Sequence, residues 1–246
     1  MLASVRSQEE AEIALAQGAD IIDCKEPTHG ALAALPLNIV HDIVESIKGR
    51  RPVSAVVELP YDASHARRAF EEVIETGVDY VKFAFPLTRD ASDIIAILSP
   101  LTTRTRLIAV FFADLSPELD CLPLLAQAGF YGVMLDTAHK GKGRLIDFMS
   151  IGRLSEFVST CRTLKLSCGL AGALEPPDVP RLLVTGADVL GFRGSLCLSG
   201  NRQGSIDRDS TALIRDLIPQ QRGEHYTPIS DWSLLGHGYI EPPGLN

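Results

Sequence analysis

The chain has 246 residues, 46% of them hydrophobic and 22% charged, a composition typical of a globular protein with a large buried core. Its formal net charge of -8 argues against a nucleic-acid partner or an anionic membrane surface. No apolar run reaches the roughly 18 residues of a membrane span, and the N-terminal MLASVRSQEE lacks the apolar core of a signal peptide, so we expect a cytoplasmic protein.

Apolar runs punctuated by turn residues predict eight β-strands, in chain order at 1–5, 19–25, 52–59, 80–85, 106–113, 131–136, 166–171 and 189–194. Amphipathic stretches between them predict helices, among them 7–17, 38–48, 65–76, 117–127, 151–164 and 207–218. One pattern recurs four times, a glycine that follows a helical stretch and precedes an apolar run. Such a glycine is typical of a helix C-cap. The four are Gly18, Gly77, Gly129 and Gly186.

Eight strands alternating with helices predict an α/β protein with the (β/α)8 TIM-barrel fold, a single domain over 1–219. The alternative is an open doubly wound sheet, which needs a glycine-rich nucleotide loop after the first strand. The segment VRSQEE offers none. A C-terminal extension, 220–246, shows no clear period and holds the only tryptophan, Trp232. It is either a surface tail or an arm across a neighbouring subunit or a barrel end, and we expect a homo-oligomer.

The cysteines and histidines show no metal-binding pattern, and we expect a protein without a metal or other cofactor. The five cysteines form no CxxC pair, and their odd number is typical of reduced thiols. The six histidines form no HExxH motif and no zinc-ligand spacing. Cys197 has no identifiable histidine partner, so we interpret it as structural.

Strand parity gathers charged residues inside the predicted barrel. Residues of a barrel strand face the interior and the helices alternately. With the apolar residues placed against the helices, the inward set includes Asp23, Lys25, Glu58, Lys82, Asp136 and Arg193. Barrel interiors are normally filled by Val, Ile and Leu, and charges there are costly unless they are paired and hydrated. Most of these residues lie late in their strands, near the C-terminal mouth of the barrel, where barrel enzymes place their catalytic residues. Lys82 lies early in its strand, so we expect it deeper in the barrel interior.

One alternative is a layer of salt bridges that only fills the barrel, and another is a strand bulge that breaks the parity at one or two positions. Two inward lysines favour instead a site where a lysine amine reacts. A lysine beside a second cation and apolar walls loses its proton more easily. The neutral amine then attacks a carbonyl carbon to form a Schiff base. We therefore predict a reaction chamber containing Lys25, Lys82, Asp23 and Asp136.

Small residues after the last two strands predict a phosphate site. The segments LAGAL and RGSLCLSGNRQGS follow the seventh and eighth strands, where barrels commonly bind phosphate through backbone N–H groups. We expect Gly172, Gly194 and Ser195 to hold the anion, with Arg193 or Lys140 nearby. Lys142, in the same glycine-rich loop as Lys140, is equally consistent with a solvated position.

Five stretches, in order along the chain, resemble the (5-formylfuran-3-yl)methyl phosphate synthase family of methanofuran biosynthesis. They are GADIIDCKEPTHGALAA, DYVKFAF, VMLDTAHKGKGRLIDF, CGLAGAL and GADVLGFRGSLC, and the resemblance covers about residues 1–218. It implies a metal-free, class I aldolase-like lyase on a barrel fold. Such a lyase condenses two glyceraldehyde 3-phosphate molecules into a phosphorylated furan aldehyde, with loss of phosphate and water.

The same resemblance implies residue roles. Lys25, in the D-x-K-x-P stretch, corresponds to the Schiff-base lysine, and Lys82, in DYVK, to the proton acceptor. Asp136 and Lys140 correspond to the site residues of MLDTAHK. Two other functions remain open: a Schiff-base aldolase acting on a different phosphorylated aldehyde, and a barrel without catalysis that serves as a binding or scaffold subunit. The presence of both lysines argues against the scaffold.

Overall fold

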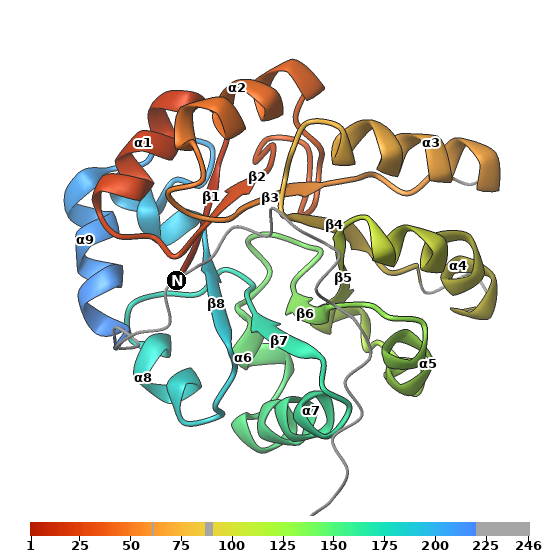
Figure 1. Cartoon of the computed structure of the whole chain (residues 1–246). Helices are drawn as coiled ribbons and strands as arrows, with labels where there is room; N and C mark the ends of the chain where they lie inside the picture. Colours follow the sequence, from red (N-terminus) through yellow and green to blue (C-terminus); the bar gives the residue numbers. More distant parts are fainter. Residues whose placement is uncertain (61, 87–90, 220–246) are drawn as a thin grey trace, which may run out of the picture.

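The fold is a closed eight-stranded parallel barrel, as predicted (Figure 1). The computed structural model describes residues 1–60, 62–86 and 91–219, so the extension 220–246 with Trp232 lies outside the described residues. Each strand pairs with the next in chain order, and β8 returns to β1. The strands are β1 (Leu2–Val5), β2 (Ile21–Cys24), β3 (Val53–Val56), β4 (Tyr80–Ala84), β5 (Arg106–Phe112), β6 (Gly132–Asp136), β7 (Ser167–Leu170) and β8 (Val189–Phe192).

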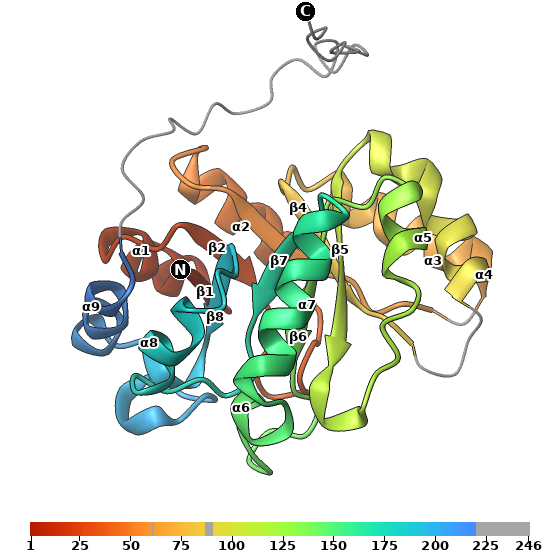
Figure 2. The ribbon, with the colours of Figure 1, turned by 90° about the horizontal axis from the view of Figure 1, so that it is seen from below.

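Helices surround the strands, and α9 packs beside α1 to complete the ring (Figure 1, Figure 2). They are α1 (Gln8–Ala16), α2 (Leu37–Ile47), α3 (Ala63–Ile74), α4 (Ala91–Leu98), α5 (Leu122–Gln127), α6 (Leu145–Phe148), α7 (Ile151–Thr163), α8 (Asp178–Leu183) and α9 (Arg208–Leu217), with short 3-10 turns at Ser99–Thr103, Ala113–Leu115, Gly194–Leu196 and Leu198–Gly200. Five of the six predicted helices both begin and end within two residues of their predicted bounds. The helix predicted over 117–127 begins only at Leu122, because Pro123 is tolerated only in a first turn. Among the described residues, no helix is long and apolar enough to cross a membrane.

Two separate apolar clusters confirm the alternation of the strands. Outward side chains such as Ile22 and Phe83 belong to one large core between strands and helices. Inside the barrel lies a much smaller cluster built on Val110, Met134 and Ala171. The prediction for Glu58 is wrong, because β3 ends two residues earlier and the Glu58 side chain is exposed beyond it.

The four repeated glycines lie in turns between a helix and the next strand. In three of these turns an aspartate follows the glycine by two positions. The four glycines have φ between 73° and 86°, a left-handed conformation that suits glycine at a helix end: Gly18, Gly77, Gly129 and Gly186. Asp79 accepts a hydrogen bond from the N–H of Val53 at 2.8 Å, and Asp188 accepts one from Cys168 at 2.7 Å. These aspartates therefore tie each turn to the neighbouring strand. After Gly129, Tyr131 takes the place of the aspartate.

Arg193 joins the end of β8 to the start of the chain. Its guanidinium forms a buried ion pair with Glu10 of α1, at 2.6 Å and 3.2 Å. The same guanidinium donates to the carbonyl groups of Ser4, Arg202 and Gly204 at 3.1, 2.9 and 2.6 Å. All five of its N–H donors are used in this way, so Arg193 stabilises the closure of the barrel.

Glu10→Ala should therefore lower the free energy of unfolding by about 3–5 kcal/mol, because it leaves the Arg193 charge buried without a partner. Glu9→Ala is the matched control, since Glu9 is the preceding residue of the same helix turn and is exposed. It should cost no more than about 0.5 kcal/mol. Urea unfolding monitored by circular dichroism measures both. Equal losses in the two variants would contradict a closing role for the pair.

Candidate active site

A cavity of about 310 Å³ opens at the C-terminal mouth of the barrel. Its lining includes three lysines and two aspartates: Lys25, Lys82, Lys140, Asp23 and Asp136. They come from β2, β4 and β6 and from the residues that follow β2 and β6. The structure thus brings together the two lysines and two carboxylates that strand parity places in one chamber.

The charges alternate across the cavity. The Nζ atom of Lys82 lies 2.6 Å from Oδ1 of Asp23. On the other side, Asp136 lies between two lysines, with Oδ1 2.6 Å from Nζ of Lys140 and Oδ2 3.7 Å from Nζ of Lys25. With Arg193, Arg202 and Glu175, which line the same cavity, the lining carries five cations against three carboxylates, an excess of positive charge in a chain whose net charge is -8. This local excess suits an anionic substrate.

Asp23 is a fixed anion at the centre of the barrel. Its side chain is fully buried and accepts hydrogen bonds from the hydroxyl groups of Ser4 and Ser54 at 2.8 and 2.6 Å, besides its contact with Lys82. Burial acts to raise the pKa of Asp23, but the charges of Lys82 and Lys25 and the hydrogen bonds outweigh it, so the pKa is lowered. Asp23 is therefore ionised at neutral pH and orients Lys82.

Burial is the main influence on Lys82 and Lys140. It lowers the pKa of Lys82, and the nearby charge of Lys25 acts in the same direction against the attraction of Asp23. Burial likewise lowers the pKa of Lys140, against the attraction of Asp136. An amine whose pKa is lowered toward neutrality exchanges protons more readily with a substrate, which is the property required of an acid–base group.

Lys25 is the least constrained of the three lysines. Lys82 and Lys140 each have a carboxylate oxygen at 2.6 Å, whereas the nearest one to Lys25 that the structure describes is 3.7 Å away. The Asp136 carboxylate is held instead by Lys140 and by the N–H of Thr137, at 2.7 Å. The Lys25 amine thus lies in the cavity without a short hydrogen bond to either carboxylate.

The residues predicted to bind phosphate lie together in the cavity wall. Gly172, Gly194 and Ser195 line the cavity on the side opposite β3 and β4, and Lys140 lies in the same lining. Gly172 has a φ of 120°, and a Cβ atom there would lie 3.0 Å from the Thr137 side chain, so only glycine suits the position. Lys142 is exposed, in agreement with the solvated alternative.

The contacts of Arg193 do not suit the phosphate role predicted for it. Arg193 lines the cavity, but its five donors are used within the protein, which argues against the phosphate role expected for it. Arg202 also lines the cavity and uses two donors, toward the carbonyl groups of Pro27 at 2.5 Å and Gly30 at 3.0 Å. Strand parity cannot predict Arg202, because it lies in a loop beyond β8. Its position in the segment RGSLCLSGNRQGS, after the eighth predicted strand, was the only sequence signal for it.

Asp114 is a second residue that the sequence did not reveal. It is buried after β5 and accepts hydrogen bonds from the N–H groups of Ala138 and His139 at 2.7 and 2.8 Å. The His139 ring contacts the same carboxylate at 2.9 Å. Asp114 thus fixes the loop that carries Lys140.

Fold and cavity together define an α/β-barrel enzyme whose charged side chains meet where barrel enzymes place their chemistry. A family model described as 4-HFC-P synthase matches residues 1–215. The chain belongs to this family.

Relatives of known name agree with the family. A protein of Methylorubrum extorquens, provisionally named (5-formylfuran-3-yl)methyl phosphate synthase, is 39% identical over 207 residues, covering 84% of this chain and 86% of its own. Proteins that carry this name without qualification are 31% identical in Methanococcus maripaludis, over 89% of this chain and 97% of theirs, and 32% identical in Methanopyrus kandleri, over 88% and 96%.

Solved structures show the same fold at low sequence identity. Phosphoribosyl anthranilate isomerase from Thermus thermophilus superimposes with a TM-score of 0.61 at 13% identity, over 88% of this chain and 96% of that one. A 3-hexulose-6-phosphate synthase superimposes with a TM-score of 0.54 at 16% identity, over 89% and 99%. Both support the TIM barrel.

The Lys82–Asp23 pair yields a stability prediction. Asp23→Asn should lower the free energy of unfolding at neutral pH by about 3–5 kcal/mol, because it leaves the Lys82 amine buried without its anion. Adding Lys82→Met should recover part of this loss, since no unpaired charge remains. Urea unfolding of the two variants and the wild type measures the difference. A double variant less stable than Asp23→Asn would contradict the pairing.

The same carboxylate predicts an acid dependence. The pKa of Asp23 is lower in the folded protein than its ordinary value, so its contribution to stability is complete above about pH 4 and declines as the pH falls through the folded-state pKa. The stability difference between wild type and Asp23→Asn should therefore shrink below about pH 4. Unfolding midpoints between pH 7 and pH 2 measure it, and a constant difference would contradict the lowered pKa.

Proposed function

We propose that this protein is a (5-formylfuran-3-yl)methyl phosphate synthase that forms its product from two molecules of glyceraldehyde 3-phosphate, with loss of phosphate and water, in the biosynthesis of methanofuran or an analogue. The family match and the relatives that carry this name support the reaction. The observation that carries the catalytic part is the loosely held amine of Lys25, 3.7 Å from its carboxylate, beside a tightly held second lysine.

Lys25 is the proposed nucleophile. Its neutral amine adds to the aldehyde carbon of the first triose phosphate, and loss of water from the adduct gives an imine. Because no carboxylate among the described residues holds the Lys25 amine by a short hydrogen bond, the amine can turn toward the carbonyl carbon without breaking a strong contact. The protonated imine withdraws electrons from the adjacent C–H bond.

Lys82 is the proposed base for that C–H bond. Loss of the proton gives an enamine, whose carbon attacks the aldehyde of the second triose phosphate. Burial lowers the pKa of Lys82, which favours a fraction of neutral amine, and Asp23 fixes the amine's position at 2.6 Å. Asp136, placed between Lys25 and Lys140, is suited to proton transfers during the dehydration steps.

The phosphate groups of the substrates are proposed to bind at the wall of Gly172, Gly194 and Ser195, with Lys140 and Arg202 supplying positive charge. Arg202 supports this role because the two carbonyl contacts that orient it leave other N–H groups for an anion.

Replacement of the two catalytic lysines should have different effects. With glyceraldehyde 3-phosphate and borohydride, wild type should form a reduced covalent adduct, and Lys25→Ala should form none. Lys82→Ala should still form adduct but should produce furan aldehyde roughly 10²–10⁴-fold more slowly, as measured by product absorbance. Lys25→Arg should not restore turnover, because a guanidinium remains protonated.

Lys142→Ala is the control, since Lys142 is an exposed lysine of the same mouth. It should behave as wild type in both assays. An adduct without furan aldehyde in the wild type would favour an aldolase acting on another phosphorylated aldehyde. Neither adduct nor product would favour a barrel without catalysis.

Arg202→Gln should raise the KM for the triose phosphate about 10- to 100-fold, the value of one hydrogen bond to a charged group, with a smaller change in kcat. Lys142→Gln removes a charge from the exposed part of the mouth and should leave KM within about twofold. Steady-state kinetics at constant ionic strength compare the two variants. An unchanged KM in Arg202→Gln would exclude Arg202 as a phosphate ligand.

A further inference from the structure

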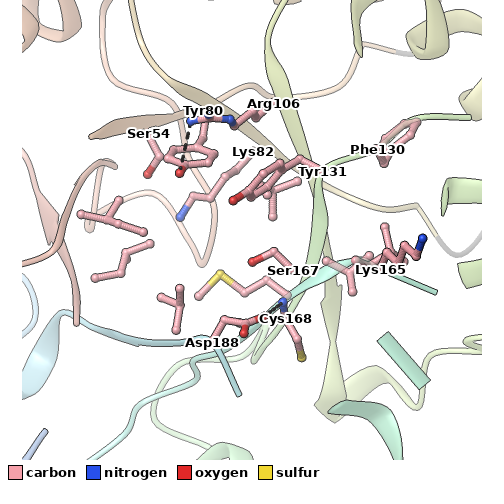
Figure 3. Close-up of a pocket in the computed structure, with 18 of the residues that line it drawn as sticks. Ser54, Tyr80, Lys82, Arg106, Phe130, Tyr131, Lys165, Ser167, Cys168 and Asp188 are labelled. Carbon is pink, nitrogen blue, oxygen red and sulfur yellow. Dashed lines mark hydrogen bonds between the residues drawn. The ribbon is translucent and has the colours of Figure 1, made fainter. Parts of the chain in front are cut away.

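A second cavity, of about 840 Å³, lies at the opposite, N-terminal end of the barrel (Figure 3). We call it the lower chamber. The first residues of six strands line it: Leu2, Ile21, Tyr80, Arg106, Ser167 and Val189. Three side chains, Leu2, Lys82 and Met134, line both this chamber and the mouth. They form a thin partition between the two.

The lower chamber exists because the strands on one side of the barrel carry small inward residues. Gly169 and Gly191 face the interior, and Met134 occupies the space beside them. A Cβ atom on either glycine would lie 2.9 Å from an atom of Met134. Met134 therefore occupies the middle of the barrel interior, whereas the first residue of β7, Ser167, is small and leaves space below it.

Arg106 presents a positive charge to this space. Its guanidinium lies against the rings of Tyr80 and Tyr131, at 5.3 and 5.2 Å from their centroids, and Nη1 is 3.5 Å from the Tyr80 hydroxyl (Figure 3). Within the described ranges, the structure records no ion pair for Arg106. Tyr131 stands where the other three glycine turns carry an aspartate, so this turn supplies no carboxylate beside the arginine.

The lining as a whole is electropositive. Its charged side chains are Lys82, Arg106, Arg162, Lys165 and Asp188. Lys82 is already paired with Asp23 at 2.6 Å, so three cations remain against one carboxylate. The carboxylate already accepts a hydrogen bond from the N–H of Cys168. In a chain of net charge -8, this imbalance of sign favours a bound anion. The aromatic rings and Met134 favour a flat apolar body on the same ligand.

We propose that the lower chamber binds a small organic anion with a flat ring, in the class of ring carboxylates and ring-bearing phosphate monoesters. Its anionic group contacts Arg106, and its ring lies between the tyrosines and Met134. The ligand reaches Lys82 from below, through the partition shared with the mouth. Any effect of this ligand on turnover rests on the proposed function. The binding of the ligand is independent of that function.

The test uses 4-iodobenzoate, because anomalous scattering locates its iodine in a soaked crystal. The expected result is iodine in the lower chamber, with the carboxylate at Arg106. In calorimetry, Arg106→Gln should weaken binding about 10- to 100-fold, the value of a charge-assisted hydrogen bond. Arg202→Gln, at the mouth, should leave the Kd within about twofold, and the uncharged 4-iodobenzamide should bind more weakly than the acid.

Iodine in the mouth alone, no binding by the wild type, or an unchanged Kd in Arg106→Gln would overturn the proposal. If Arg106→Gln does not fold, Tyr131→Ala decides, because its side chain is 42% exposed and its loss spares the core. That variant should weaken binding at least about threefold, the lower end of a lost aromatic contact. An unchanged Kd in it would equally overturn the proposal. None of these measurements depends on turnover. They therefore test the lower chamber independently of the proposed reaction.

Discussion

The buried contact between Lys82 and Asp23 is the constraint on which the rest of the barrel interior depends. Two charges removed from water are costly, and the attraction between them compensates only when the remaining hydrogen-bonding capacity is also satisfied. Here Ser4 and Ser54 supply hydroxyl groups to the carboxylate. Inward positions that usually carry Val or Ile in such barrels are therefore occupied by small polar residues. The barrel interior is consequently not filled by apolar side chains alone.

With Asp23 committed to Lys82, the three lysines share two carboxylates unequally. Asp136 is shared by Lys140 at 2.6 Å and Lys25 at 3.7 Å, and Lys25 consequently keeps the weakest contact. This inequality gives similar side chains different chemistry. The structure supplies one fixed anion, two amines whose pKa is lowered by burial and one amine without a short contact to a described carboxylate. Apolar packing is concentrated instead in the core between strands and helices.

Strand parity predicted the centre of the site because it needs only the direction of successive side chains. It placed Asp23, Lys25, Lys82 and Asp136 correctly, all within a strand or one residue beyond its end. The rule failed for Glu58, two residues past the end of β3, where no pairing fixes the backbone. Beyond the strands, position depends on contacts that the local sequence does not show.

Arg193 and Arg202 illustrate this limit. Arg193 has the inward parity, but its partner Glu10 is 183 residues away in the chain and draws the guanidinium toward α1. Arg202 lies in no strand and reaches the mouth through carbonyl groups of the loop after β2, 175 and 172 residues away. The lower chamber was equally hidden, because it results from small residues on several strands that meet only when the barrel closes.

The location of the covalent bond tests the central claim most directly. Wild-type protein reduced with borohydride in the presence of glyceraldehyde 3-phosphate, then digested and mapped by mass spectrometry, shows which lysine formed the imine. The unequal sharing of the two carboxylates predicts the added mass on the peptide that contains Lys25. An adduct on Lys82 or Lys140 would contradict it, because those amines are the ones held at 2.6 Å.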